Sequence, residues 1–300
     1  MHIEHLSGIG FGLGAAACQS LSYVLSRRFV GQTGSTPALL LIVSHLMMGA
    51  GSLLLLLVLS PRNLPPFAAY AAPLAGAGLF YLVAQLGLFY VLRTVESSRV
   101  APMLGMKVLV LACMAVLLTR QGLHPLQWAA VGMSAMAAWL LNEAGGRVPG
   151  RCLAVLGMTI TCYCLSDLSI AELMRRLADV KPLPAFTGAA LTYLLCAAVI
   201  LPFAFRRDLL QARVWRLAAP FAVAWFGAMC LLYACFALIG VVFGNIIQST
   251  RGIMSVAIGW GIARVGHTHL ESRVGRHVFW RRVAGAVLML AAVALYLLAR

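Results

Sequence analysis

Residues 244–263 read GNIIQSTRGIMSVAIGWGIA, and nineteen of these twenty residues are uncharged. Most of them are apolar, and about twenty mostly apolar residues are the length of a helix that crosses a lipid bilayer. The exception is Arg251, which puts a full positive charge near the centre of the stretch. A charge at the centre of a membrane-spanning helix costs about 2.5–3.5 kcal/mol on insertion scales. The stretch therefore predicts a transmembrane helix whose arginine faces a partner, a cavity or a substrate.

The composition of the whole chain indicates the same environment. The 300 residues are 62% hydrophobic and 10% charged, whereas about a quarter of the residues of a soluble domain are charged. A water-soluble chain of this length could not bury so much apolar surface, so we interpret the protein as an integral membrane protein. The net charge of +15 does not indicate a nucleic-acid partner, because the basic residues lie in short connectors, where they orient helices against the membrane.

Ten stretches are long and apolar enough to be transmembrane helices. We expect them near residues 7–26, 38–59, 70–92, 100–119, 126–142, 152–173, 185–205, 217–239, 243–263 and 283–299. The gaps between them hold proline, glycine or charged residues and are too short for a soluble domain. The sequence therefore predicts an all-α, polytopic membrane protein with ten transmembrane helices.

The chain also repeats itself, which divides it into two halves of five helices, residues 1–145 and 150–300. An offset of 140 residues aligns Tyr23 with Tyr163 and Ser26 with Ser166. Because five is an odd number, the second half must enter the membrane in the opposite sense. Inverted repeats of this kind are typical of transporters, with the substrate site near the bilayer midplane between the repeats. We expect alternating access in which one repeat rocks against the other.

The connections within each half carry a more specific likeness. A tight turn joins the third and fourth helices, RTVESSRVAP (93–102) in one half and IGVVFGN (239–245) in the other. A fifth helix led by tryptophan follows, as in PLQWAAVGM (125–133). In this pattern the whole chain resembles the EamA-type transporters of the drug/metabolite transporter superfamily. The resemblance implies a secondary active transporter, multi-pass in the cell inner membrane, that moves a small metabolite by alternating access, with export favoured.

Two positions depart from the pattern of that family. The turn RQGLHP (120–125) lacks the glutamate that is common between the fourth and fifth helices. His45 stands where an arginine is often found in the second helix. The substrate of a characterised member therefore does not carry over to this chain.

The orientation of the chain stays open. Of the 23 basic residues, 15 lie in the odd-numbered connectors and 6 in the even-numbered connectors and the termini. Because lysine and arginine are enriched on the cytoplasmic side of a membrane, this count predicts that both termini lie outside. The habit of the family predicts cytoplasmic termini instead.

Three charged residues are expected inside the membrane. Lys107 and Arg251 lie mid-way in the predicted fourth and ninth helices, and Asp167 is the carboxylate clearly inside a span. An inverted repeat brings the two cations near one pseudo-two-fold axis, so we expect them to line a central cavity and to attract a carboxylate or phosphate. Guanidinium suits this role because it binds planar oxyanions bidentately. The phosphate-translocator branch of the superfamily resembles this arrangement, with basic residues on its fourth and ninth helices.

Asp167 leaves two alternatives open. It can pair with Lys107 or Arg251 and simply lock helices together. It can also carry a coupling proton, because burial disfavours the charged form of a carboxylate and a nearby cation favours it. The coupling mechanism of the small multidrug-resistance branch, which uses a glutamate on the first helix, does not transfer, since the first helix predicted here has no carboxylate.

Other polar residues within the spans are candidates for binding the substrate. They are Tyr23, His45, Gln85, Tyr163, Asn245 and Gln248, with Gln19 as a further lining residue. Gln248, Arg251 and Ser255 are spaced so that they share one helix face, which favours the ninth helix as a lining element. The alternative is that these side chains make hydrogen bonds between helices, which contribute modestly to stability.

Rival functions are an intramembrane enzyme, a lipid-handling protein and a scaffold without transport activity. The loop GHTHLESRVGRH (266–277) holds three histidines and a glutamate, but its spacing matches no strong metal motif. No signature of a zinc peptidase, a nucleophilic serine or a nucleotide-binding loop is found. We therefore expect no enzyme activity, no cofactor and no metal. The expected partners are a small-molecule substrate, a coupling proton and the lipid bilayer. The substrate can be anionic, and the chain can form a homodimer.

Overall fold

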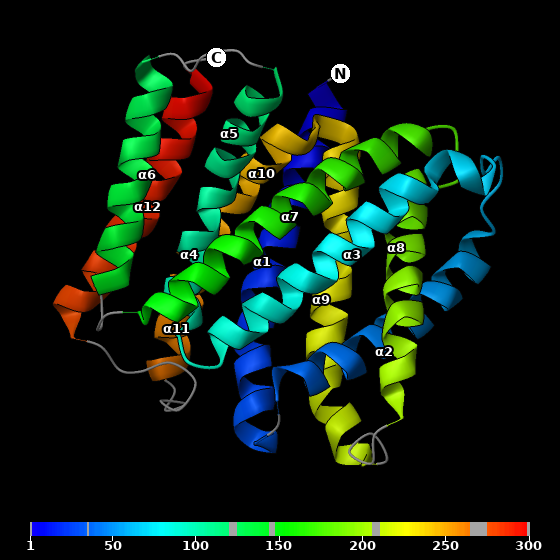
Figure 1. The fold of residues 1–300 in the computed structure, drawn as a ribbon, viewed down its shortest axis with the longest axis horizontal. Helices are drawn as coiled ribbons and strands as arrows, with labels where there is room; N and C mark the ends of the chain where they lie inside the picture. The colour runs from blue at the N-terminus through cyan, green and yellow to red at the C-terminus, as the bar shows by residue number, and fades with distance from the viewer. Residues whose placement is uncertain are drawn as a thin grey trace.

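The computed structural model describes residues 2–34, 36–119, 125–143, 148–205, 211–264 and 275–298. These residues are almost entirely helical (Figure 1). The first part of the chain forms α1 (His2–Thr33), α2 (Pro37–Leu59), α3 (Phe67–Leu92), α4 (Ser97–Met103), the 3₁₀ turn η1 (Leu104–Met106), α5 (Lys107–Thr119) and α6 (Pro125–Glu143). The second part forms α7 (Gly150–Arg176), α8 (Pro184–Ile200), the 3₁₀ turn η2 (Leu201–Ala204), α9 (Ala212–Ile239), α10 (Val241–Ser249), α11 (Arg251–Arg264) and α12 (Arg276–Leu298).

The helices confirm an all-α, multi-pass membrane protein. Six of the described helices are long and apolar enough to cross a membrane: α1, α2, α3, α7, α8 with its 3₁₀ extension, and α9. Their side chains also suit a bilayer, because large apolar residues face outward; Leu57 and Val223, for example, are 66% and 73% exposed. In lipid every backbone polar group must be satisfied within the chain, and a helix does this within a single segment.

Proline and glycine mark several helix boundaries. Pro37 and Pro184 stand in the first turn of α2 and α8, where a missing N–H is tolerated because the first N–H groups of a helix have no partner within it. Gly240 separates α9 from α10 with a φ of 78°. Glycine adopts this left-handed backbone without steric cost, so the chain can change direction between two apolar segments.

Two helices that the apolar pattern predicts as continuous are interrupted. Between residues 97 and 119, η1 separates α4 from α5, and Lys107 is the first residue of α5. Between residues 241 and 264, the single residue Thr250 separates the end of α10 at Ser249 from the start of α11 at Arg251. Lys107 and Arg251 therefore lie mid-way along their helical segments, at points where the α-helix is interrupted.

Local chemistry accounts for the second interruption. Before α11, the hydroxyl of Thr250 donates to the carbonyl oxygen of Ile247 over 2.7 Å, and the hydroxyl of Ser249 donates to the carbonyl oxygen of Asn245 over 3.1 Å. Such side-chain bonds compete with the backbone ladder of a helix and often bend it.

The helices pack into two bundles, and each bundle is built from both parts of the chain (Figure 1). We call the first the aromatic bundle; in it α1 packs on α9, α2 on α8 and α3 on α7. We call the second the broken-helix bundle, which consists of α4, η1, α5, α6, α10, α11 and α12. In it α6 packs on α12 and α4 on α11. The first turn of α1 and the last turn of α12 lie at the same end of the molecule (Figure 1).

Candidate functional site

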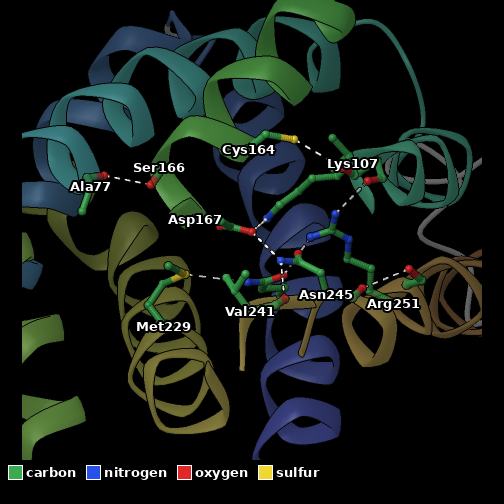
Figure 2. Close-up of polar contacts among 12 residues, drawn as sticks. Ala77, Lys107, Cys164, Ser166, Asp167, Met229, Val241, Asn245 and Arg251 are labelled. Carbon is green, nitrogen blue, oxygen red and sulfur yellow. Dashed lines mark hydrogen bonds and ion pairs between the residues drawn. The ribbon is translucent and has the colours of Figure 1, made fainter. Parts of the chain in front are cut away.

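A buried carboxylate joins the two bundles near the centre of the molecule. The Nζ atom of Lys107 lies 2.5 Å from Oδ2 of Asp167, and the side-chain amide of Asn245 donates to the same oxygen over 2.7 Å. These three residues lie on α5, α7 and α10, and each is at most 5% exposed. Figure 2 shows them converging on Asp167. The ammonium of Lys107 therefore compensates the charge of the Asp167 carboxylate, and the amide of Asn245 donates a hydrogen bond to it.

Arg251 lies beside this cluster, and its guanidinium has uncharged partners (Figure 2). One terminal nitrogen donates to Oε1 of Gln19 and the other to the backbone oxygen of Leu104, each over 3.1 Å. Tyr23 is within hydrogen-bonding reach of the same side chain. In the part of the chain that the structure describes, Arg251 forms no ion pair with a carboxylate, although the residue is only 6% exposed.

Polar atoms around Arg251 retain unused hydrogen-bonding capacity. Its Nε, the Oε1 of Gln248 and the Oγ of Ser255 are buried without a hydrogen-bond partner among the described residues. The three residues are spaced as residues that share one helix face. A buried polar group without a partner is unfavourable and is commonly completed by a water or a ligand. The arrangement can therefore bind a group that both accepts and donates hydrogen bonds.

Both cations stand at equivalent points of their helices. Lys107 is the first residue of α5 and Arg251 is the first residue of α11. The backbone N–H of Lys107 bonds to the carbonyl oxygen of Leu104, and that of Met254 bonds to the carbonyl oxygen of Thr250. Each interruption therefore directs a cationic side chain to the same region, and the two positive charges favour an anion.

Some predicted site residues lie close to this cluster. The ring of Tyr163 lies 5.5 Å from Nζ of Lys107, and its hydroxyl donates to Oε1 of Gln85 over 2.5 Å. The amide nitrogen of Gln248 donates to the backbone oxygen of Gly12 over 3.4 Å. The structure thus brings Tyr23, Tyr163, Gln85, Asn245 and Gln248 to the surroundings of the three charged residues.

His45 lies apart from the charged residues. Its Nδ1 is 2.7 Å from the backbone oxygen of Leu41, and its Nε2 is 3.2 Å from the hydroxyl of Tyr81. The ring is fully buried and stacks on Tyr193. Aromatic rings connect this histidine to the charged cluster, since Tyr81 also packs against Tyr163 at a centroid distance of 6.4 Å.

Sequence reasoning missed several partners of the cations. The backbone oxygen of Leu104 accepts from Arg251, and the backbone oxygen of Arg251 accepts from the hydroxyl of Ser20 over 3.1 Å. Cys164 donates to the backbone oxygen of Lys107 over 3.3 Å. Every residue has a backbone carbonyl group, so the side-chain pattern does not show which carbonyl accepts a hydrogen bond. The helix interruptions could have indicated these acceptors. Gln19 was a lining candidate, but nothing in the sequence assigned it to Arg251.

The described residues hold no group of three or more histidine, cysteine, aspartate or glutamate side chains that could bind a metal. The histidine-containing loop noted above falls mainly on residues 265–274, which lie outside the described residues.

Comparisons with known proteins identify a transporter family. Residues 6–143 match the model of the EamA-like transporter family, which is part of the drug/metabolite transporter superfamily, so the predicted resemblance is confirmed. No curated protein matches the sequence. A solved structure titled "Crystal structure of protein" matches with a TM-score of 0.62 and 15% sequence identity, covering 100% of this chain and 98% of its own. At that identity the likeness shows the fold alone.

Proposed function

We propose, from the membership of residues 6–143 in the EamA-like transporter family, that the protein is a secondary active transporter. It moves a small anionic metabolite across the inner membrane by alternating access, in the direction of export. Transport families of this kind act on small molecules within a bilayer, which agrees with the apolar outer surface of the helices. The site residues described above are the proposed binding and coupling groups.

The observation that carries the anionic substrate is the charge of the buried cluster. The cluster holds two cations, Lys107 and Arg251, and one carboxylate, Asp167. Lys107 forms an ion pair with that carboxylate. A charge buried away from water is strongly unfavourable unless it is paired. We therefore expect an anion to bind Arg251, because it would compensate the buried positive charge. The guanidinium offers two donors in a plane that matches a carboxylate or a phosphate. Tyr23, Gln248 and Ser255 supply further polar contacts around that anion.

The inverted repeat of residues 1–145 and 150–300 belongs to this proposal. Helices α4, η1 and α5 count as one interrupted span, and α10 and α11 as another, which gives ten spans in all. Pairing α1 with α7, α2 with α8, α3 with α9, and α6 with α12 makes the packing symmetric, because α1 on α9 then corresponds to α7 on α3. The lysine of the first interrupted span then corresponds to the arginine of the second. Interrupted helices near the midplane are typical of substrate sites in such transporters.

Asp167 is the proposed coupling group. Its Oδ2 accepts from both Lys107 and Asn245, so a proton that binds there competes directly with the lysine. Protonation would release Lys107, which could then contact the substrate together with Arg251. A proton and an anion would therefore favour each other at this site and cross together, so the proposed export runs down the outward gradient of the anion.

The test is a transport assay with purified protein in liposomes. Anionic, zwitterionic and cationic metabolites are screened for thermal stabilisation of the protein and for uptake. Wild type is compared with Arg251→Gln and Lys107→Gln. The matched control is Arg175→Gln, which removes an arginine whose side chain is 67% exposed and paired with Glu172 on the surface.

We expect an anion to stabilise wild type and the control, and we expect both central variants to lose that response while they remain folded. Retention of full activity by Arg251→Gln would contradict the anion site. A response to cations or neutral solutes alone would also contradict it, and the substrate site would then have to be centred on Asp167.

A further inference from the structure

Aromatic side chains join the two sequence halves inside the aromatic bundle. Tyr81 of α3 packs against Tyr163 of α7, Tyr193 of α8 and Trp225 of α9, with ring centroids 5.3–6.4 Å apart. Trp225 also packs against Tyr23 of α1 and donates from Nε1 to the hydroxyl of Tyr193 over 2.9 Å. The residues are buried. Helices that lie far apart in the sequence therefore share one interlocked core.

The broken-helix bundle is also joined across the two halves. Arg282 of α12 donates to the hydroxyl of Ser98 on α4 over 2.7 Å and pairs with the carboxylate of Glu96 in the preceding turn. Gly105 lies so close to α12 that a Cβ atom there would be 2.8 Å from the Cγ atom of Met289. Within this bundle, a buried ion pair and close backbone packing hold α12 against the start of α4 and η1.

The contacts between the bundles include close packing of Gly12 on α1 against Ile247 on α10, but their centre is polar. Lys107 and Asn245 of the broken-helix bundle bond to Asp167 of the aromatic bundle. Three further bonds cross the same boundary: Arg251 to Gln19, Ser20 to the backbone oxygen of Arg251, and Gln248 to the backbone oxygen of Gly12. We call this set of contacts the polar seam. Hydrogen bonds of this kind can be exchanged for bonds to water, a proton or a substrate, whereas interlocked rings cannot separate without opening a void.

From this contrast we infer that the moving units of the transporter are the two bundles and not the two sequence repeats. The inference rests on the proposed alternating access and replaces the expectation that one repeat rocks against the other. Rocking between the repeats would have to separate Tyr81 from Trp225 and Arg282 from Glu96. Rocking between the bundles leaves both pairs intact and opens the polar seam, where all three central charges lie. Binding at the site then acts directly on the surface along which the molecule moves.

Distance measurements between pairs of spin labels test this inference. Genetically encoded spin labels leave the eight native cysteines in place. Four outward-facing positions serve as label sites: Leu54 on α2, Leu126 on α6, Val223 on α9 and Val287 on α12. The pairs 54/223 and 126/287 join different halves within one bundle, and the pairs 54/126 and 223/287 join different bundles within one half. Distances are measured in lipid nanodiscs at acidic and basic pH, in the wild-type background and with Asp167→Asn.

We expect the two pairs within bundles to keep a single narrow distribution in every condition. For the two pairs between bundles, the mean distance between the labels should shift, or the distribution should split into two populations. The change should exceed the width of the distributions measured within bundles. The reverse pattern would overturn the inference in favour of rocking repeats. Four unchanged distances in all conditions, Asp167→Asn included, would also overturn it. Because no substrate is used, failure here leaves the anion site standing, and failure of the uptake assay leaves the bundle motion standing.

Discussion

At the scale of single residues, the two central cations have different surroundings. Lys107 is compensated by Asp167, and Arg251 is held by the neutral oxygens of Gln19 and Leu104. The sequence identified all three charged residues, because charges are rare within apolar spans. It left the pairing open, since a lysine and an arginine in the predicted spans are equally plausible partners. The choice depends on where the helix interruptions place each side chain.

The pairing of Lys107 with Asp167 leads to a double-mutant prediction. Removing one partner leaves a buried charge without compensation, which costs about 3–5 kcal/mol in folded proteins. We expect Lys107→Met and Asp167→Asn each to lower the thermal unfolding temperature, and the double variant to lose less than the sum of the two. Unfolding is followed by intrinsic fluorescence in detergent micelles. Additive losses would show that the two side chains do not interact.

Arg251 leads to a prediction on the shape of the donor group. Arg251→Lys keeps the positive charge but removes the planar pair of donors that binds a carboxylate or phosphate bidentately. We expect substrate affinity to fall about tenfold, which corresponds to about 1.4 kcal/mol, and protein stability to change little. Binding is measured by calorimetry with the anion found in the liposome screen. Equal affinity of the two proteins would mean that Arg251 acts only as a point charge.

At the scale of elements, the sequence predicted where the helices lie but not where two of them are interrupted. The predicted span 38–59 and helix α2 differ by a single residue, because apolar length alone defines a transmembrane segment. The two interruptions lie within apolar sequence, so the hydropathy pattern is continuous across them. At the second, Thr250 and Ser249 give only a weak indication, since both residues are tolerated within helices.

Close packing of α1 against α10 gives a prediction with an internal control. A Cβ atom added at Gly12 would lie 2.8 Å from Cγ2 of Ile247, whereas at Gly10 it would meet nothing within 4 Å. Overpacking typically costs about 1–3 kcal/mol, so we expect Gly12→Ala to lower both thermal stability and transport rate. Gly10→Ala should leave both unchanged or raise stability slightly, because alanine favours a helix. Equal behaviour of the two variants in these assays would refute the close approach.

At the scale of the whole molecule, the grouping of helices into two bundles is the feature that the sequence could not give. The repeat predicted two halves that are consecutive in the chain, and nothing in the residue pattern indicates that α3 packs on α7 or α2 on α8. Such pairings depend on how side chains such as Tyr81 and Trp225 interlock in space. The predicted alignment of Tyr23 with Tyr163 did select two tyrosines that lie beside the charged cluster.

The interlocked core makes Trp225 a sensitive position for a stability test. It is 2% exposed, and its ring stacks on Phe221 at a centroid distance of 5.8 Å. Removing such a side chain from a packed core costs about 3–5 kcal/mol. We expect Trp225→Ala to lower the thermal unfolding temperature strongly and Trp280→Ala, at a residue that is 57% exposed, to lower it little. Similar losses in a fluorescence melt would show that the aromatic bundle is not held together by this ring.

The unequal number of cations and carboxylates at the centre also has an electrical consequence. With Lys107, Arg251 and Asp167 all ionised, the empty site holds one net positive charge, and a monovalent anion that binds together with a proton on Asp167 leaves this charge unchanged. A membrane potential does work only on a charge that moves, about 2.3 kcal/mol per elementary charge for each 100 mV across the full membrane. The potential then acts on the loaded step and on the return of the empty carrier with equal size and opposite sign. Each step of the proposed cycle depends on voltage, although one full cycle moves no net charge.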